Sequence, residues 1–128
     1  MKALLDTHAF LWAALDDPRL STNARELIED RANGMSFSAA SAYELTAKSR
    51  AGRLDLPAAV EVYIPTRLAA FGFDALAIDV SHAIRAASLP PIHRDPWDRL
   101  LIAQAQIEDL PIITIDPIIG QYDVETIW

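Results

Sequence analysis

The chain has 128 residues, of which 52% are hydrophobic and 23% charged. This is the size of one domain, and the composition argues against a disordered protein. The absence of cysteine excludes a disulfide scaffold and a thiolate metal site. The formal net charge of −7 argues against a passive nucleic-acid binder, because phosphate backbones attract Lys and Arg surfaces. A nucleic-acid substrate would require a bound cation or a basic partner to offset these acids.

The amino-terminal residues look only briefly like a signal peptide. Asp6 and His8 interrupt the apolar run too early for a hydrophobic signal core. No uncharged apolar stretch approaches the 18 or more residues that a membrane span needs. We therefore expect a soluble, cytoplasmic protein that has no membrane association.

Strands and helices are predicted to alternate along the chain. The first half is expected to contain a strand from Lys2 to Asp6, a helix from Thr7 to Leu15, a helix capped by Ser21 and ending near Asp30, a strand from Met35 to Ser38, and helices from about Ala40 to Ala51 and from Pro57 to Ala70. The second half is expected to contain a strand from Phe73 to Ile78, a helix from Ser81 to Ala87, a helix from Pro96 to Glu108, and strands from Pro111 to Ile115 and from Val124 to Ile127.

This order predicts an α/β fold. Nearly continuous apolar strands separated by helices are typical of a parallel sheet that is covered on both faces. We expect a single domain over residues 1–128, with a central parallel sheet of four to five strands flanked by helices. Ligands bind such sheets beyond the carboxyl ends of the strands, so the functional residues are expected there.

Four carboxylates lie near these predicted strand ends, namely Asp6, Glu44, Asp98 and Asp116. Taken singly, most of them have a structural explanation. Asp6 and Asp116 are each in place to cap the helix or turn that follows. Glu44 completes a capping box that starts at Ser41, and Lys48 follows it by four residues, the spacing of a helical salt bridge.

Asp98 is the hardest of the four to explain by structure alone. Pro96 at the first helical position makes Asp95 the expected N-cap, which accounts for Asp95. Asp98 then lies in the first turn of a helix that is apolar nearly all round, at the edge of the core. A carboxylate held there calls for a cation, so we assign Asp98 to function and Asp95 to helix capping.

The joint placement of the four acids predicts a metal site. Clustered carboxylates repel one another unless a cation lies between them. Oxygen ligands without cysteine suit Mg²⁺ or Mn²⁺, which can activate water for hydrolysis of a phosphodiester. His8 and His93 could approach this edge, where supporting or capping roles are favoured over metal ligation. Basic residues that could contact phosphate are Arg53, Arg94 and Arg99.

Four stretches together resemble the PIN domain family, and within it the VapC-type toxins of prokaryotic toxin–antitoxin pairs. They are Leu4 to His8, Glu44 to Leu54, His93 to Ala105, and Thr114 to Asp116. The resemblance follows the whole chain in order, and the third stretch is the most specific. In two departures from the family pattern, Trp97 stands where phenylalanine is more usual, and no basic residue lies between Thr114 and Asp116.

The resemblance implies a Mg²⁺- or Mn²⁺-dependent endoribonuclease toxin. Asp6, Glu44, Asp98 and Asp116 match the acidic quartet of the family. The resemblance further implies a homodimer, a VapB-like antitoxin that neutralises the enzyme, and RNA as substrate, with transfer RNA as the family-level expectation. The alternative is a catalytically silent PIN-fold interaction domain, in which the acids only cap helices and the apolar first helix binds a partner.

Overall fold

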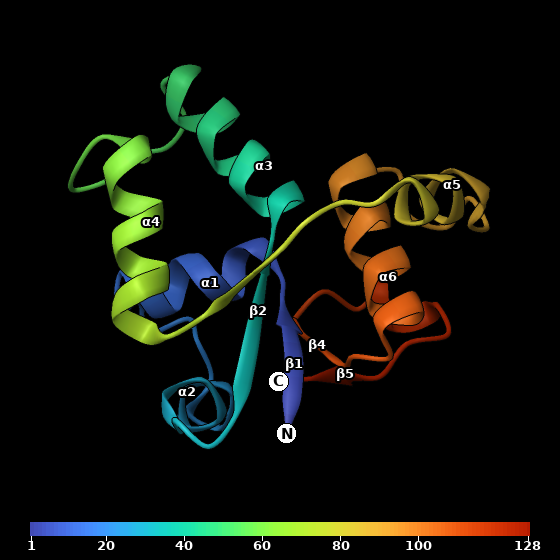
Figure 1. The fold of residues 1–128 in the computed structure, drawn as a ribbon, viewed down its shortest axis with the longest axis horizontal. Helices are drawn as coiled ribbons and strands as arrows, with labels where there is room; N and C mark the ends of the chain where they lie inside the picture. The colour runs from blue at the N-terminus through green and yellow to red at the C-terminus, as the bar shows by residue number, and fades with distance from the viewer.

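Five short parallel strands form the centre of the molecule (Figure 1). The computed structural model describes residues 1–128. Across the sheet the strands follow in the order β3 (Asp74–Leu76), β2 (Gly34–Ser38), β1 (Lys2–Leu5), β4 (Ile112–Ile113) and β5 (Thr126–Ile127). Every neighbouring pair is parallel, which confirms the predicted sheet.

Six helices flank the sheet. They are α1 (Thr7–Ala14), α2 (Thr22–Glu29), α3 (Ala39–Arg50), α4 (Val60–Phe71), α5 (Val80–Ser88) and α6 (Pro96–Glu108), and a 3₁₀ turn, η1 (Ile119–Gln121), follows β4. The predicted alternation of strands and helices is confirmed, as are the caps Ser21 and Asp95. None of the helices combines the length and the hydropathy that a bilayer crossing requires.

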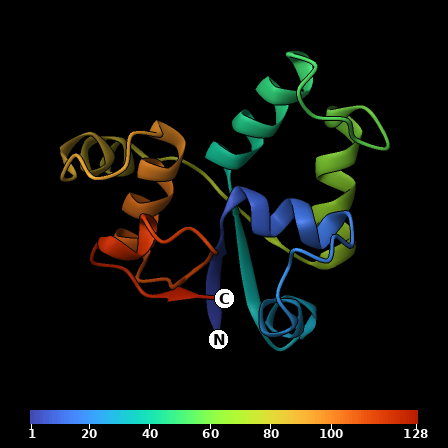
Figure 2. The same cartoon turned by 180° about the vertical axis from the view of Figure 1, so that it is seen from behind.

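The two faces of the sheet are covered by different helices, which Figures 1 and 2 show from opposite sides. Side chains alternate across a strand, so Ala3 and Leu5 pack with Phe10 of α1 in the larger core. Leu4, between them, packs against Leu101 of α6 in the smaller core. The side chains of α1, α2 and α4 therefore pack in the larger core on one face of the sheet, and those of α5 and α6 lie on the other face.

One predicted capping box and one predicted helix start are wrong. The capping box from Ser41 does not form, because α3 already begins after β2 and Ser38 is its N-cap, accepting a hydrogen bond from Ala40 N. The helix expected to open at Pro57 begins at Val60 instead. Residues 57–59 are exposed, whereas burial at Val60 and Ile64 sets the inward face of α4.

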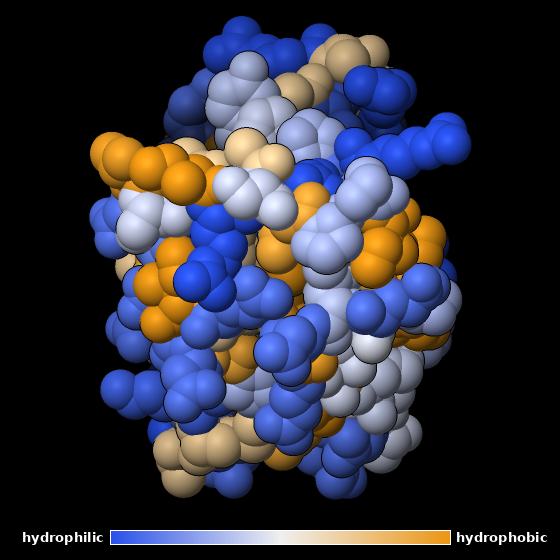
Figure 3. Space-filling view, turned by 90° about the vertical axis from the view of Figure 1, so that its right-hand side faces the viewer, coloured by the Kyte–Doolittle hydropathy of each residue, from blue (hydrophilic) through white to orange (hydrophobic).

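The face that carries α5 and α6 has mixed polarity (Figure 3). Exposed hydrophobic side chains on these helices include Val80, Ile84 and Ile107. Polar side chains separate the hydrophobic ones in this view, so they do not form one continuous apolar patch.

Candidate active site

Asp6 lies where β1 ends and α1 begins. It is only 5% exposed and caps α1, because Ala9 N donates to its Oδ1 over 2.7 Å. The Thr114 hydroxyl, from the segment after β4, donates to its Oδ2. Burial raises the pKa of the Asp6 carboxyl, and the nearby charge of Asp116 adds to that rise. Asp6 is therefore both a cap, as its position predicts, and a buried acid facing another acid.

Asp98 lies in the first turn of α6, three residues after the N-cap Asp95. Burial raises its pKa to about 7, with further contributions from the charges of Asp95, Glu44 and Asp6, while His93 opposes the rise. A carboxyl in such surroundings gains by binding a cation when it ionises. Asp95 Oδ1 accepts from Trp97 N over 2.9 Å, so its capping role is confirmed.

Glu44 is buried in α3 and both of its oxygens have partners. Oε1 accepts from the Thr7 hydroxyl over 2.8 Å, and Oε2 accepts from the Lys48 ammonium over 2.7 Å. The Thr7 hydroxyl in turn lies 2.8 Å from the buried Ser41 hydroxyl. The predicted salt bridge to Lys48 is confirmed. Ser41 anchors Glu44 through Thr7 instead of capping the helix.

Asp116 follows β4 and completes the group. Its Oδ1 accepts from Ile118 N over 2.8 Å, as expected of a capping residue, and its Oδ2 lies 2.9 Å from His93 Nε2. The same His93 nitrogen lies 3.1 Å from Asp98 Oδ2. One imidazole therefore contacts two of the four acids, and Thr114 links Asp116 N to the Asp6 carboxylate.

The donor set fits a hard divalent cation. The acids come from the end of β1, from α3, from α6 and from the segment after β4. The charge of Asp116 is close enough to raise the pKa of Asp6, and those of Glu44 and Asp6 are close enough to raise the pKa of Asp98. Lys48 and His93 contact these carboxylates, and Lys48 is directed to Glu44 alone. Oxygen ligands of this type are those that Mg²⁺ and Mn²⁺ prefer.

The three arginines predicted as possible phosphate contacts, Arg53, Arg94 and Arg99, have different surroundings in the structure. The Arg99 guanidinium donates to four backbone carbonyls, those of Ala86, Leu89, Pro90 and His93. It holds the chain that leads into α6, which is a structural role, and a contact between Arg99 and phosphate stays a prediction. Arg94 is exposed just before α6, and Arg53 is exposed at the rim of a hollow between α1 and α3.

That hollow concentrates positive charge beside the acids. It has a volume of about 270 Å³, and it is lined by Thr7, His8, Leu11, Trp12, Arg19, Leu45, Lys48, Arg53 and Leu54. Arg19 is paired with Asp17 and lies 4.8 Å from the centre of the Trp12 ring, whereas Arg53 has no ion pair. Thr7 and Lys48 border this hollow and also bind Glu44, so it adjoins the acidic cluster.

Sequence reasoning missed the hydroxyl groups that hold the acids. Thr7, Ser41 and Thr114 are buried and bind the carboxylates or one another. Thr7 and Thr114 belong to motifs on which the resemblance rests, and their positions directly beside strand ends were the available signal. His93 was assigned a supporting or capping role, and its distances to Asp98 and Asp116 agree with a supporting one.

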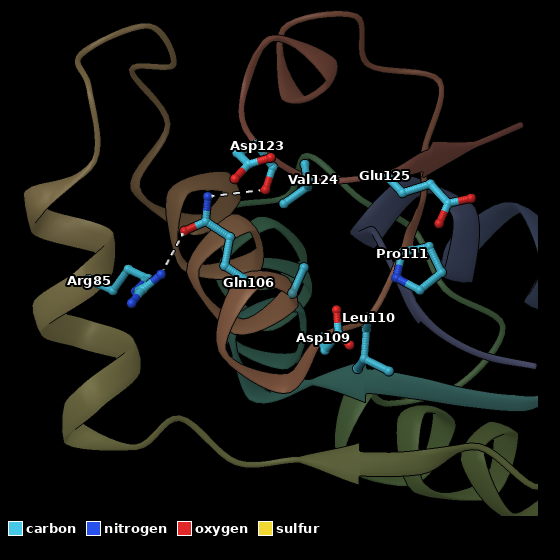
Figure 4. Close-up of a pocket in the computed structure, with 9 residues that line it drawn as sticks. Arg85, Gln106, Asp109, Leu110, Pro111, Asp123, Val124 and Glu125 are labelled. Carbon is cyan, nitrogen blue, oxygen red and sulfur yellow. Dashed lines mark hydrogen bonds between the residues drawn. The ribbon is translucent and has the colours of Figure 1, made fainter.

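The largest hollow of the molecule lies elsewhere, at the opposite edge of the sheet (Figure 4). It measures about 590 Å³ and lies at the carboxyl end of α6 and the start of β4. Gln106 joins Arg85 to the Asp123 carbonyl across it, both at 3.4 Å. It holds no converging set of acids comparable to the group at the carboxyl edge.

A second histidine–carboxylate group joins α5 to α6. His82 is fully buried, its Nδ1 accepts from Asp79 N over 2.9 Å, and its Nε2 lies 2.9 Å from Glu108 Oε1. Asp79 is the N-cap of α5, so this group secures the start of α5 and ties it to the end of α6.

Known proteins resemble the chain in sequence and in structure. It is 36% identical over 92 residues to Ribonuclease VapC16 of Mycobacterium tuberculosis, a match that covers 66% of this chain and 65%, less than two thirds, of that protein. VapBC2 of Rickettsia felis, solved bound to a promoter DNA fragment, superposes with a TM-score of 0.73 at 14% identity, over 99% of this chain and 98% of the other.

Two further solved structures share the fold. A toxin–antitoxin complex from Klebsiella pneumoniae gives a TM-score of 0.68 at 19% identity, over 98% of this chain and 96% of the other. DNA-bound VapBC from Salmonella typhimurium gives 0.67 at 18% identity, over 99% and 97%. Residues 3–125 match the PIN domain family, so the chain belongs to that family, as its four motifs and parallel sheet predict.

Proposed function

We propose that the protein is a divalent-metal-dependent endoribonuclease toxin of the VapC type. The observation that carries this proposal is the convergence of Asp6, Glu44, Asp98 and Asp116 at the carboxyl edge of the sheet, with the pKa of Asp98 raised to about 7. Helix capping alone does not require acids to gather closely enough to oppose one another's ionisation. The likeness to Ribonuclease VapC16 supports RNA as the substrate.

Each acid has a role that its contacts suggest. Asp6, Asp98 and Asp116 would hold Mg²⁺ or Mn²⁺, which when bound supplies an activated water and neutralises charge on the phosphodiester. Glu44 has both oxygens engaged by Thr7 and Lys48, so it orients water or substrate at the edge of the site. Lys48 pairs with Glu44 and adds positive charge at the border of the hollow between α1 and α3.

The hollow between α1 and α3 offers a path for the RNA. An acidic protein must still attract a polyanion, and Arg53 brings unpaired positive charge next to the acids. Arg94, at the start of α6, is the second candidate phosphate contact. Single-stranded or loop RNA fits an exposed edge better than duplex does, because its phosphates and bases are separately accessible. Transfer RNA, which carries such loops, is the proposed target.

The proposed partner is a VapB-like antitoxin with basic residues. The net charge of −7 favours a basic partner, and VapBC proteins and a toxin–antitoxin complex share this fold. The proposal also includes a homodimer, and it places the protein in the cytoplasm, where both RNA and antitoxin are found.

RNA cleavage by the purified protein tests the proposal. Wild type is incubated with a transfer RNA pool and with an unstructured RNA, in Mg²⁺, in Mn²⁺ and in EDTA, beside Asp98→Asn protein purified in the same way. The expected result is cleavage that requires both the metal and Asp98. Cleavage that persists equally in the Asp98→Asn protein would come from a contaminant or another site and would remove the proposal.

The alternative is a silent interaction domain, and metal binding distinguishes it. A working carboxylate cluster gains thermal stability as Mn²⁺ is added, because ligands that bind only the folded state stabilise it. Isolated helix caps would leave the melting temperature unchanged. A protein that is not stabilised by Mn²⁺ and does not cleave RNA would fit the silent domain.

A further inference from the structure

His93 has one ring nitrogen whose role is fixed by the backbone. Asp95 N–H donates to His93 Nδ1 over 3.1 Å. A ring nitrogen that accepts a hydrogen bond carries no proton, so the proton of the neutral imidazole is on the other nitrogen, Nε2. The N-terminal turn of α6 therefore selects the tautomer of this histidine.

The protonated nitrogen faces the acids. His93 Nε2 lies 2.9 Å from Asp116 Oδ2 and 3.1 Å from Asp98 Oδ2, and the side chain is only 10% exposed. Carboxylate oxygens accept, so the Nε2 proton points at this pair of acids. Each carboxylate has about four lone-pair positions, so a bond to His93 leaves it able to bind a cation as well.

We propose that His93 is a positioning residue for the metal site, a hydrogen-bond donor to Asp116 and Asp98 and not itself a ligand. The inference rests on the proposed metal-dependent function. By distance alone His93, Asp98 and Asp116 could form a three-ligand group, since their ligand atoms lie within 4.8 Å of one another. Ligation through Nε2 would move the proton to Nδ1, where it would face the Asp95 N–H, a donor against a donor.

The proposal explains how Asp116 is held without a basic neighbour in the chain. No basic residue separates Thr114 from Asp116, and His93, from a different segment, provides the donor. The loop around His93 is secured by other means, because His93 N donates to the Tyr122 hydroxyl over 2.7 Å and the His93 carbonyl accepts from Arg99. The imidazole ring can therefore be replaced while these backbone contacts remain.

Two substitutions of His93 distinguish the roles of its two ring nitrogens. In His93→Asn the side-chain oxygen lies near the place of Nδ1 and can still accept from Asp95 N, but nothing reaches the acids. In His93→Gln an amide N–H lies near the place of Nε2 and can still donate to Asp116. Far-UV circular dichroism and melting in EDTA verify that both variants are folded.

The first measurement is Mn²⁺ affinity by calorimetry on metal-free protein. Removing a donor that holds a metal-binding carboxylate typically weakens metal binding by about 10- to 100-fold, so His93→Asn is expected to lose at least about tenfold. His93→Gln should stay within about threefold of wild type, since it keeps the donor. Equal losses in both variants would indicate direct ligation by the ring, and no loss in either would indicate a ring without a role. Each of these results would overturn the proposal.

The second measurement reads the tautomer directly, by ¹⁵N NMR of the ring nitrogens. His93 should show a protonated Nε2 and an acceptor Nδ1, and it should keep both when Mg²⁺ is added. His82 has the same arrangement of contacts and is read in the same spectra for comparison. Loss of the Nε2 proton on Mg²⁺ binding would make His93 a ligand and overturn the inference.

These tests separate this inference from the function on which it rests. Wild-type protein that binds no Mn²⁺ and cleaves no RNA would remove both. Wild-type protein that binds Mn²⁺ and cleaves RNA, together with His93→Asn protein that binds Mn²⁺ equally well, would remove only the role of His93.

Discussion

Two histidines of this protein are bound in the same way but sit in different electrostatic surroundings. In each, Nδ1 accepts a backbone N–H, from Asp79 for His82 and from Asp95 for His93, and Nε2 faces a carboxylate. His82 meets Glu108, whose side chain is 38% exposed. His93 meets Asp98 and Asp116, and these lie within electrostatic range of Asp6 and Glu44.

The difference lies in the acids and not in the imidazole. One partly exposed carboxylate opposite a buried histidine makes a tether between two helices, through a single N–H. Two half-buried carboxylates opposite a similar histidine, with the buried Asp6 and Glu44 nearby, leave negative charge that one N–H donor does not balance. The same local arrangement therefore gives a structural contact in one place and, with more acids, a candidate metal site in the other.

The largest effect is expected from removing one acid of each group. Asp98→Asn should lower the rate of RNA cleavage by about 10³-fold, since a metal ion that stabilises transition-state charge contributes several kcal/mol. Glu108→Gln, its matched control at the other histidine, should leave the rate within about twofold, because Glu108 is the last residue of α6 whereas Asp98 lies in its first turn. Single-turnover cleavage assays with Mn²⁺ measure both. Comparable losses of cleavage rate in the two variants would mean that the acids at His93 and the acid at His82 do not differ in function.

The second effect concerns stability and pH. Because burial and neighbouring charges raise the pKa of Asp98 from 3.8 to about 7, the folded protein holds this proton more tightly than the unfolded chain does. The metal-free protein should therefore lose stability as pH rises from about 4 to 7 and then level off, a contribution of roughly 4 kcal/mol at most. Urea unfolding in EDTA across this pH range measures it.

Two controls locate that pH dependence. Asp98→Asn should flatten the profile, and its metal-free form should be more stable than wild type at pH 8. Saturating Mn²⁺ should restore stability to wild type at pH 8 but not to Asp98→Asn. If the stability of the wild-type protein in EDTA stays level or rises between pH 4 and 7, the raised pKa of Asp98 in the metal-free protein is contradicted.

The third effect is at the other histidine. His82→Ala removes a fully buried ring and leaves Asp79 N and Glu108 without their partner, so the free energy of unfolding should fall by about 2–4 kcal/mol. Cleavage per folded molecule and Mn²⁺ affinity should stay at wild-type values. A His82→Ala protein that is as stable as wild type, or that binds Mn²⁺ less tightly, would give His82 a role other than the tether.

Sequence reasoning predicted the architecture and could not predict how the acids are held. Apolar runs and capping signals locate strands and helices because these are local properties, as Pro96 and Asp95 illustrate at α6. The error at Ser41 arose because α3 begins earlier, with Ser38 as its N-cap, which leaves the Ser41 hydroxyl to contact Thr7, 34 residues away. The bond between Thr114 and Asp6 spans 108 residues, a pairing that only the strand order β1–β4 creates.

The smallest effect is expected at the rim of the hollow between α1 and α3. Arg53 is exposed and unpaired there, so Arg53→Ala should raise the KM for RNA by about 3- to 10-fold with little change in kcat, since a phosphate contact positions substrate without taking part in the chemistry. Arg50→Ala is the matched control, because Arg50 is equally basic but is paired with Glu61 at 3.0 Å. The KM difference should shrink as salt is raised, since phosphate contacts are electrostatic. Equal effects of the two substitutions on KM would mean that RNA binding depends on total charge and not on this hollow. A fall in kcat for Arg53→Ala would mean that Arg53 takes part in the chemical step, beside Lys48 and Glu44.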